Sequence, residues 1–333
     1  MKVRPLPVLD EAACLLDRTA DAVCDACARA CPTGAMRVGD EGLELVADLC
    51  TACGGCGAAC PARAITVERA VPLPLTETDR SGAVALVCPE ARGPGPCLQS
   101  LGLEALATLW LRGVRRLLIA TGDCDSCPSG GNLRLADHLA TLNALLGDRG
   151  LPGLEVGVLP ARGTDRVPRL GEGPDARRRG LFALAAPRPE DSERKAAASA
   201  LARLQGLPGR GTAPRFAFAP RIDAQRCTAC HLCLRLCPET ALTLIIAEDQ
   251  PAAYQIDASQ CTGCGLCVQS CAEGAIDIVA LAAATDGISL VSRQCRGCRV
   301  AYQRPAESLR EDDGLCPICA KAPHYRKLHQ VLP

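Results

Sequence analysis

The cysteines constrain this sequence more than any other residue type, because the 24 of them fall into six groups of four. A metal site built from thiolates alone needs four ligands, so six complete groups with none left over indicate six metal sites. The groups are Cys14, Cys24, Cys27 and Cys31; Cys50, Cys53, Cys56 and Cys60; Cys88, Cys97, Cys124 and Cys127; Cys227, Cys230, Cys233 and Cys237; Cys261, Cys264, Cys267 and Cys271; and Cys295, Cys298, Cys316 and Cys319. Aromatic residues make up only 2% of the chain, which excludes a large aromatic core. We therefore expect metal–thiolate bonds to hold part of the fold together.

The remaining composition argues against several classes of protein. The formal net charge is zero, so no global basic field favours nucleic acid or an anionic membrane as a partner. No run of about 18 apolar residues predicts a transmembrane helix. Residues 1–10 lack the basic-then-apolar layout of a secretory signal. We expect a cytoplasmic protein, in which clustered cysteines bind metals and do not form disulfides.

The strongest motif is C-x2-C-x2-C-x3-C, which is complete at residues 50–60, 227–237 and 261–271. Its tight loop lets three thiolates surround one face of a [4Fe–4S] cubane, and the fourth cysteine points to the other cluster of a pair. Thiolates are soft ligands that suit iron–sulfur clusters, and the tandem arrangement disfavours zinc as the alternative. His231 lies inside the second of these loops, either as a solvent-facing residue or as a donor close to cluster sulfur.

Two stretches of the chain follow one plan, since residues 221–280 repeat the arrangement of residues 14–70 and indicate an internal duplication. Both stretches resemble the bacterial two-[4Fe–4S] ferredoxin family in these motifs. The resemblance implies, for each stretch, a pseudo-twofold pair of β-hairpin and short-helix units that share two clusters by crossed ligation. The implied ligand sets are Cys14, Cys24, Cys27 and Cys60 for the first cluster; Cys50, Cys53, Cys56 and Cys31 for the second; Cys227, Cys230, Cys233 and Cys271 for the third; and Cys261, Cys264, Cys267 and Cys237 for the fourth.

The first cysteine group departs from the motif. Strict spacing places its first cysteine at position 21, where the sequence has Asp21, and Cys14 lies seven residues earlier. Either a longer loop brings Cys14 to the iron, or Asp21 is the ligand, or the site holds only three irons. We favour Cys14, because a carboxylate is a harder and weaker ligand for this iron than a thiolate.

The chain between the two duplicated stretches contains a different pattern. Short apolar runs at 83–87, 117–120 and 155–159 predict buried strands, and residues 98–112 and 132–146 have helical spacing. The order β-α-β-α-β indicates a small parallel sheet covered by helices. Cys88 and Cys124 each follow a predicted strand, so they are expected at the edge of the sheet where such folds bind ligands.

Residues 119–124, Ile-Ala-Thr-Gly-Asp-Cys, with Gly131, Asn132 and Arg134 after them, carry a further resemblance. They resemble the small iron–sulfur subunit associated with methyl-viologen-reducing hydrogenase and heterodisulfide reductase. The resemblance implies electron relay between larger partners and a [2Fe–2S] cluster on one set of thiols. That set is Cys88, Cys97, Cys124 and Cys127. A zinc site and unligated core thiols remain the alternatives.

The last cysteine group forms two C-x2-C knuckles separated by seventeen residues. This arrangement is typical of a zinc ribbon, in which each knuckle donates two thiolates to a tetrahedral site. Mononuclear iron of the rubredoxin type and another iron–sulfur cluster are the alternatives. The predicted ligands are Cys295, Cys298, Cys316 and Cys319.

Together these patterns predict an α+β multidomain protein with two ferredoxin-like modules, a small parallel α/β domain and a zinc-ribbon-like C-terminus. The segment between the α/β domain and the second module is rich in Arg, Gly, Pro and Ala, and is either a flexible connector or a strap that docks a partner. The predicted bounds are 1–72 for the first module, 80–160 for the α/β domain, 161–219 for the linker, 220–282 for the second module and 290–333 for the ribbon.

The predicted function is electron transfer between a donor and an acceptor oxidoreductase, as a carrier or as an electron-transfer subunit. No nucleotide-binding loop and no acid, base or nucleophile constellation indicates an enzyme. The expected cofactors are four [4Fe–4S] clusters, one [2Fe–2S] cluster and one zinc, and the expected partners are redox proteins, without nucleic acid. A catalytic reductase with a substrate-binding cluster and a structural or assembly factor are the alternative functions.

Overall fold

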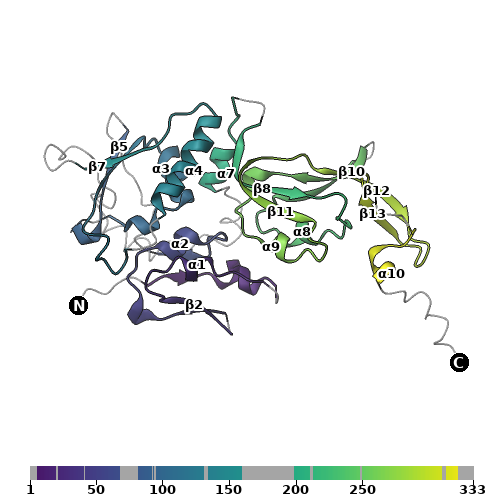
Figure 1. The fold of residues 1–333 in the computed structure, drawn as a ribbon, viewed down its shortest axis with the longest axis horizontal. Helices are drawn as coiled ribbons and strands as arrows, with labels where there is room; N and C mark the ends of the chain where they lie inside the picture. The colour runs from purple at the N-terminus through teal and green to yellow at the C-terminus, as the bar shows by residue number, and fades with distance from the viewer. Residues whose placement is uncertain are drawn as a thin grey trace, which may run out of the picture. The chain divides into compact units, whose positions relative to one another are not determined.

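The computed structural model describes residues 6–19, 22–40, 42–67, 82–91, 93, 95–130, 134–159, 199–210, 213–247, 250–309 and 313–321. The chain divides into two compact units, Met1–Arg215 and Phe216–Pro333, each built from short helices and several small sheets (Figure 1). Within the described ranges, no helix has the length and the apolar composition that crossing a membrane requires. All 24 cysteines lie in these ranges, and none forms a disulfide.

Residues 6–67 form the N-terminal module, whose first and last strands lie side by side. Its elements are β1 (Val8–Leu9), η1 (Glu11–Ala13), η2 (Leu15–Asp17), α1 (Ala26–Arg29), β2 (Met36–Gly39), β3 (Gly42–Leu45), η3 (Ala47–Leu49), α2 (Gly55–Ala59) and β4 (Ile65–Thr66). β1 pairs antiparallel with β4, and β2 forms a hairpin with β3. Cys27 and Cys56 are buried in one cluster with Met36, Ile65 and Val67, so the thiols are part of the core.

Residues 82–159 form the central domain, which has the predicted parallel sheet. The elements are β5 (Ala83–Val87), η4 (Pro89–Ala91), η5 (Leu98–Ser100), α3 (Leu103–Leu111), β6 (Arg116–Ala120), α4 (Leu135–Asp148) and β7 (Glu155–Val158). The strand order β5-β6-β7 is parallel throughout, which confirms the β-α-β-α-β prediction. The first helix begins later than predicted, because residues 98–100 form the separate turn η5.

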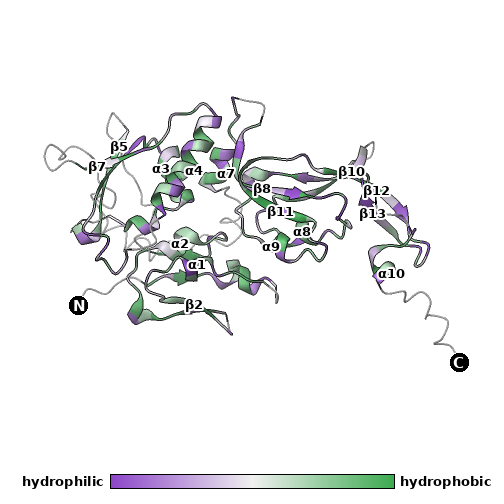
Figure 2. Ribbon diagram, in the orientation of Figure 1, coloured by the Kyte–Doolittle hydropathy of each residue, from purple (hydrophilic) through white to green (hydrophobic). Residues whose placement is uncertain are grey.

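α3 and α4 pack against each other, as right-handed crossovers between neighbouring parallel strands require (Figure 1). Each helix carries hydrophobic and hydrophilic residues (Figure 2). Leu106 and Leu109 of α3 and Leu142, Leu145 and Leu146 of α4 are fully buried. This core is aliphatic, as the low aromatic content requires.

The predicted linker, 161–219, ends in ordered structure. α7 (Ala200–Gln205) begins after Ser199, and the Glu104 carboxylate of α3 accepts hydrogen bonds from the N–H groups of Ala200 at 2.7 Å and Leu201 at 3.0 Å. Leu204 is fully buried. The end of this segment is therefore not a flexible connector, because a carboxylate cap and apolar packing hold α7 against the central domain. Residues 161–198 lie outside the described residues.

Asp148, at the end of α4, accepts three hydrogen bonds from Arg215: from the backbone N at 2.9 Å, Nε at 2.8 Å and Nη2 at 2.9 Å. These bonds hold the pKa of Asp148 at about 2, below its ordinary value of about 3.9. A lowered folded-state pKa contributes stability above about pH 4, and this contribution is lost as the pH falls toward 2.

We predict that Asp148→Asn lowers the free energy of unfolding at pH 7 by about 1 kcal/mol, a modest figure because water screens the partly exposed Arg215. Urea denaturation of both proteins measures the difference. The difference should persist down to about pH 4 and shrink below it. Equal stability at pH 7 would contradict this prediction.

Residues 213–283 form the C-terminal module, and the strands after it join the same sheet. The elements are β8 (Arg215–Ile222), α8 (Leu232–Leu236), β9 (Leu242–Ala247), β10 (Gln250–Ile256), η6 (Ala258–Gln260), α9 (Leu266–Gln269), β11 (Ile276–Ala283), β12 (Ile288–Gln294), β13 (Ala301–Pro305) and α10 (Pro317–Lys321). β8 pairs with β11, and β13-β12-β10-β9 form one four-stranded sheet. Ile288 and Ser289 of β12 pair with Tyr254 and Ala253 of β10, so the strand that leads into the predicted ribbon at 290–333 begins in the sheet of the module that precedes it.

Candidate metal centres

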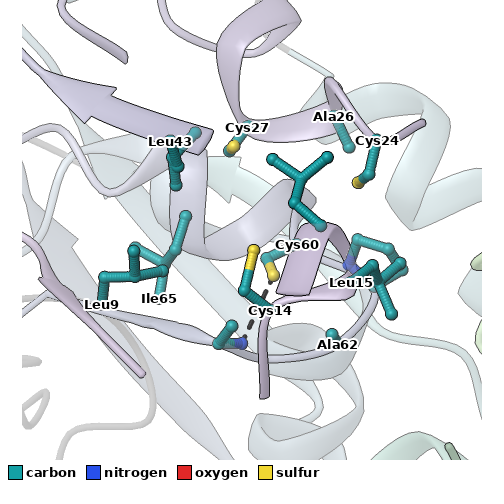
Figure 3. Close-up of a pocket in the computed structure, with 13 residues that line it drawn as sticks. Leu9, Cys14, Leu15, Cys24, Ala26, Cys27, Leu43, Cys60, Ala62 and Ile65 are labelled. Carbon is teal, nitrogen blue, oxygen red and sulfur yellow. Dashed lines mark hydrogen bonds between the residues drawn. The ribbon is translucent and has the colours of Figure 1, made fainter. Parts of the chain in front are cut away.

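The first candidate site is a pocket in the N-terminal module lined by Cys14, Cys24, Cys27 and Cys60 (Figure 3). The four sulfur atoms surround the pocket in Figure 3, and its walls are aliphatic, including Leu15. Burial, together with the neighbouring thiolates of Cys60 and Cys24, raises the pKa of Cys27 to about 11. The four cysteines of the predicted first set are therefore close neighbours.

A repeated backbone hydrogen bond explains how Cys14 reaches this pocket. The N–H of Asp10 donates to the Ala64 carbonyl at 2.8 Å. Asp10 lies four residues before Cys14, and Ala64 lies four residues after Cys60. The same bond recurs three times with the same spacing and the same length. The other donor–acceptor pairs are Val46–Ala35, Asp223–Ala275 and Asp257–Ala241, each at 2.8 Å.

In all four cases the donor lies four residues before a cysteine and the acceptor lies four residues after one. Cys14 thus has the structural position of Cys50, Cys227 and Cys261, the first cysteines of the complete motifs. The sequence contains a signal for this equivalence, since Asp-x3-Cys occurs at 10–14, 223–227 and 257–261. The cysteine spacing alone does not reveal this equivalence, whereas the spacing from aspartate to cysteine does.

The loop of the first group nevertheless has a different backbone. Each complete motif has two residues with positive φ inside the cysteine loop: Ala52 and Gly54, Ala229 and His231, and Gly263 and Gly265. Among the described residues between Cys14 and Cys31, none has positive φ. Asp21, the alternative ligand, lies outside the described residues, as does position 20.

The second candidate site is a pocket lined by Cys31, Cys50, Cys53 and Cys56. Burial raises the pKa of Cys56 to about 12, with the neighbouring thiolate of Cys53 as a further cause. A buried thiol with a raised pKa stays protonated at neutral pH unless a cation binds the thiolate. The arrangement of this site therefore suits a bound metal cluster.

The third and fourth candidate sites lie in the C-terminal module. Burial and the thiolates of Cys227, Cys230 and Cys271 raise the pKa of Cys233 to about 12, so these four cysteines are neighbours. A pocket lined by Cys237, Cys261, Cys264 and Cys267 forms the fourth site. Each of these two sites also gathers the cysteines of one set expected from crossed ligation.

In three of the four motifs, a backbone N–H group four residues further along the chain points at the sulfur of the fourth cysteine. Ala64 N lies 3.3 Å from Cys60 Sγ (dashed line in Figure 3). Ala241 N lies 3.3 Å from Cys237 Sγ, and Ala275 N lies 3.2 Å from Cys271 Sγ. Such donors stabilise thiolates and raise the reduction potential of a bound cluster. Thiolate donors, the apolar residues that line the described pockets and the N–H groups directed at Cys60, Cys237 and Cys271 fit bound iron–sulfur clusters.

Residues 226–275 match the 4Fe-4S dicluster domain. No curated protein matches the chain. The matched residues contain all eight cysteines of the third and fourth sites. The dicluster domain gives the chain at least two [4Fe–4S] clusters and implies a role in electron transfer.

In the dicluster domain, His231 is half-buried and contacts Tyr254. Its Nδ1 lies 2.8 Å from the hydroxyl of Tyr254, and the two rings meet edge to face with centroids 5.5 Å apart. Tyr254 itself is 1% exposed. His231 has a φ of 63°, a conformation that is costly for a residue with a side chain, and the bond to Tyr254 helps to offset this cost.

The central site lies at the edge of the parallel sheet, as predicted. Cys88 follows β5, and its N–H donates to the Ala120 carbonyl at the end of β6 at 2.9 Å. Burial, together with the thiolates of Cys53, Cys88 and Cys127, raises the pKa of Cys97 to about 11. Burial raises the pKa of Cys124, and the thiolates of Cys88 and Cys127 add to this effect. The four predicted thiols are therefore neighbours.

Asp123, beside the central site, is a turn residue. Its carboxylate accepts from the Asp125 N–H at 3.1 Å and from the Ser126 hydroxyl at 2.8 Å. These bonds shape the loop that carries Cys124 and Cys127.

The C-terminal site brings four sulfur atoms within 4.8 Å of one another: those of Cys295, Cys298, Cys316 and Cys319. Cys298 Sγ and Cys316 Sγ are 3.9 Å apart, which suits the tetrahedron around one ion with metal–sulfur bonds of about 2.3 Å. Burial raises the pKa of the Cys295 thiol, but hydrogen bonds from neighbouring backbone N–H groups outweigh this effect. The pKa of Cys295 is therefore lowered to about 6. This group can therefore bind a metal ion. His324 and His329 lie outside the described residues.

Proposed function

We propose that this chain is a multi-cluster electron-transfer protein that relays electrons between a donor and an acceptor oxidoreductase. The observation that carries the proposal is the dicluster domain at residues 226–275. It is supported by the N-terminal module, where the same 2.8 Å backbone bond precedes the first cysteine of each site. Two modules with one geometry indicate one chemistry.

We assign four [4Fe–4S] clusters to the four crossed sets of cysteines in the two modules. The central thiols would hold a [2Fe–2S] cluster and the C-terminal thiols a zinc ion. The clusters supply one-electron redox chemistry when bound. The residues of the chain hold the cluster iron, exclude water with aliphatic walls and direct N–H groups at sulfur, which sets the potentials.

The alternative of a catalytic reductase needs an iron that lacks a fourth protein ligand. The position of Cys14 weakens this alternative, because it places a thiol where Cys50, Cys227 and Cys261 lie in the other sites. We therefore propose an electron carrier or an electron-transfer subunit, with larger oxidoreductase subunits as partners and the cytoplasm as the compartment.

The test is the content of iron, acid-labile sulfide and zinc in anaerobically purified protein. We predict about 18 iron, about 18 sulfide and about one zinc per chain, at the usual stoichiometries of these sites. A result of about 16 iron with extra zinc would make the central domain structural. Fewer than about 8 iron in intact protein would contradict electron transfer as the function.

A further inference from the structure

The second site of the N-terminal module and the central site lie close together within the first unit. α2, which carries Cys56, packs against η5 and α3 of the central domain. η5 begins directly after Cys97. α2 therefore carries a ligand of the second site, and η5, which α2 contacts, directly follows a ligand of the central site.

Gln99 connects the two sites. A Cβ atom on Gly55 would lie 3.7 Å from Cys53 Sγ and 3.6 Å from Gln99 Cβ, so both atoms border the same small volume. The amide Nε2 of Gln99 donates to the carbonyls of Ser129 at 3.1 Å and Gly130 at 3.4 Å, in the loop that follows Cys127. One side chain thus touches the surroundings of both groups of thiols.

Gly102 makes the close approach of α2 and α3 possible. A Cβ atom at this position would lie 2.7 Å from the Ala58 carbonyl oxygen and 3.0 Å from Ala58 Cβ. A real Cβ does not tolerate such a distance to a backbone atom, so any larger residue must move α2 away from η5 and α3.

We propose that electrons pass directly between the second site and the central site, through the contact that Gly55, Gln99 and Gly102 create. In each transfer, one site is oxidised by one electron and the other is reduced by one. The first site then exchanges electrons with the central site only through the second. This inference rests on the proposed function, because it requires a cluster at both sites.

The first experiment is EPR spectroscopy of the full chain reduced with dithionite, with relaxation of the central [2Fe–2S] signal as the readout. A fast-relaxing neighbour shortens that relaxation. We expect Cys31→Ala, which removes a ligand of the second site, to abolish the effect. Cys60→Ala, the equivalent change in the first site, should preserve it. The opposite pair of results would overturn the proposed path.

A second pair of variants keeps all cysteines in place. Gly102→Val should retain the wild-type iron content but lose the relaxation enhancement, because α2 moves away from η5. Gly147→Val is the matched control in the same domain, since nothing lies within 4 Å of its Cβ position, and it should relax as the wild type does. Unchanged relaxation in Gly102→Val would overturn the role of this contact.

The two proposals fail in different ways. A wild-type protein without a central [2Fe–2S] signal would overturn this inference together with the central part of the proposed function. A central signal that shows no relaxation enhancement in the wild type, with full iron content, would overturn this inference alone.

Discussion

Replacing Cys14 with alanine is expected to lower the iron content by as much as about four per chain, whereas replacing Asp21 with alanine is expected to leave it unchanged. The reason is geometric. The bond from Asp10 N–H to the Ala64 carbonyl puts Cys14 beside Cys60, in the pocket that Cys24 and Cys27 also line. Without this thiol, the cluster loses one of its four protein ligands and either dissociates or loses one iron.

Iron analysis together with EPR of the oxidised protein measures this loss and detects a three-iron product. Cys50→Ala is the matched control, because Cys50 follows the equivalent 2.8 Å bond between Val46 and Ala35. Both cysteine variants should show the same loss. Loss of iron in Asp21→Ala, with Cys14→Ala retaining its iron, would show that the ligand assignment is wrong.

The second large effect is expected at the C-terminal site, where Cys316→Ala should release the metal and expose the third cluster to oxygen. β12 belongs to the same hairpin as that metal site, and it also covers the third site. Ile288 and Leu290 of β12 are buried in one cluster with Tyr254 and Ala229, and Cys227 packs against that cluster. Loss of the hairpin would remove this cover from a cluster ligand.

Two further contacts hold the segments next to the metal site against the dicluster domain. The side-chain amide of Gln225 donates to the Glu307 carbonyl at 2.7 Å and accepts from the Leu309 N–H at 2.7 Å. Lys321, two residues after Cys319, forms an ion pair with Glu273 at 2.8 Å. The hairpin is therefore a part of the domain's structure and not a separate appendage.

The expected magnitudes differ widely between the contacts. Structural zinc binding contributes about 10–16 kcal/mol of folding free energy in small metal-dependent domains, whereas an exposed ion pair contributes about 1 kcal/mol or less. The Cys316→Ala variant should therefore lose the bound metal. Its visible absorbance should bleach faster in air than that of the wild type. Lys321→Ala is the control, because Lys321 lies in α10, which begins directly after Cys316. This variant should retain its metal and bleach at the wild-type rate. Loss of metal without faster bleaching would contradict the covering role of β12.

Local spacing of residues predicted a large part of this protein. The cysteine loops at 50–60, 227–237 and 261–271 are short-range features, since neighbouring residues determine whether the backbone can wrap around a cluster. The parallel sheet of the central domain was equally predictable, because apolar runs and helical periodicity alternate at distances that permit only a few connections. The conserved geometry of Ala64, Ala241 and Ala275 beside their cysteines belongs to the same class, because it depends on four-residue spacing.

Other features depend on contacts between segments that are far apart in the sequence. The sequence favoured Cys14 as a ligand on chemical grounds, but the backbone geometry that brings it beside Cys60 follows from the pairing of β1 with β4. The pairing of β10 with β12, which joins the hairpin to the dicluster domain, uses backbone groups that every residue carries. The need for glycine at position 102 becomes visible only when Ala58 lies against it.

The sequence by itself thus determined which residues can bind metal, how they group into loops and which class of cofactor they suit, because thiolate chemistry and short spacing are written in neighbouring residues. The tertiary structure alone decided which site adjoins the central domain and what covers the third cluster. The physical reason is that strand pairing and close packing depend on shape and on backbone hydrogen bonds, which residue spacing does not encode.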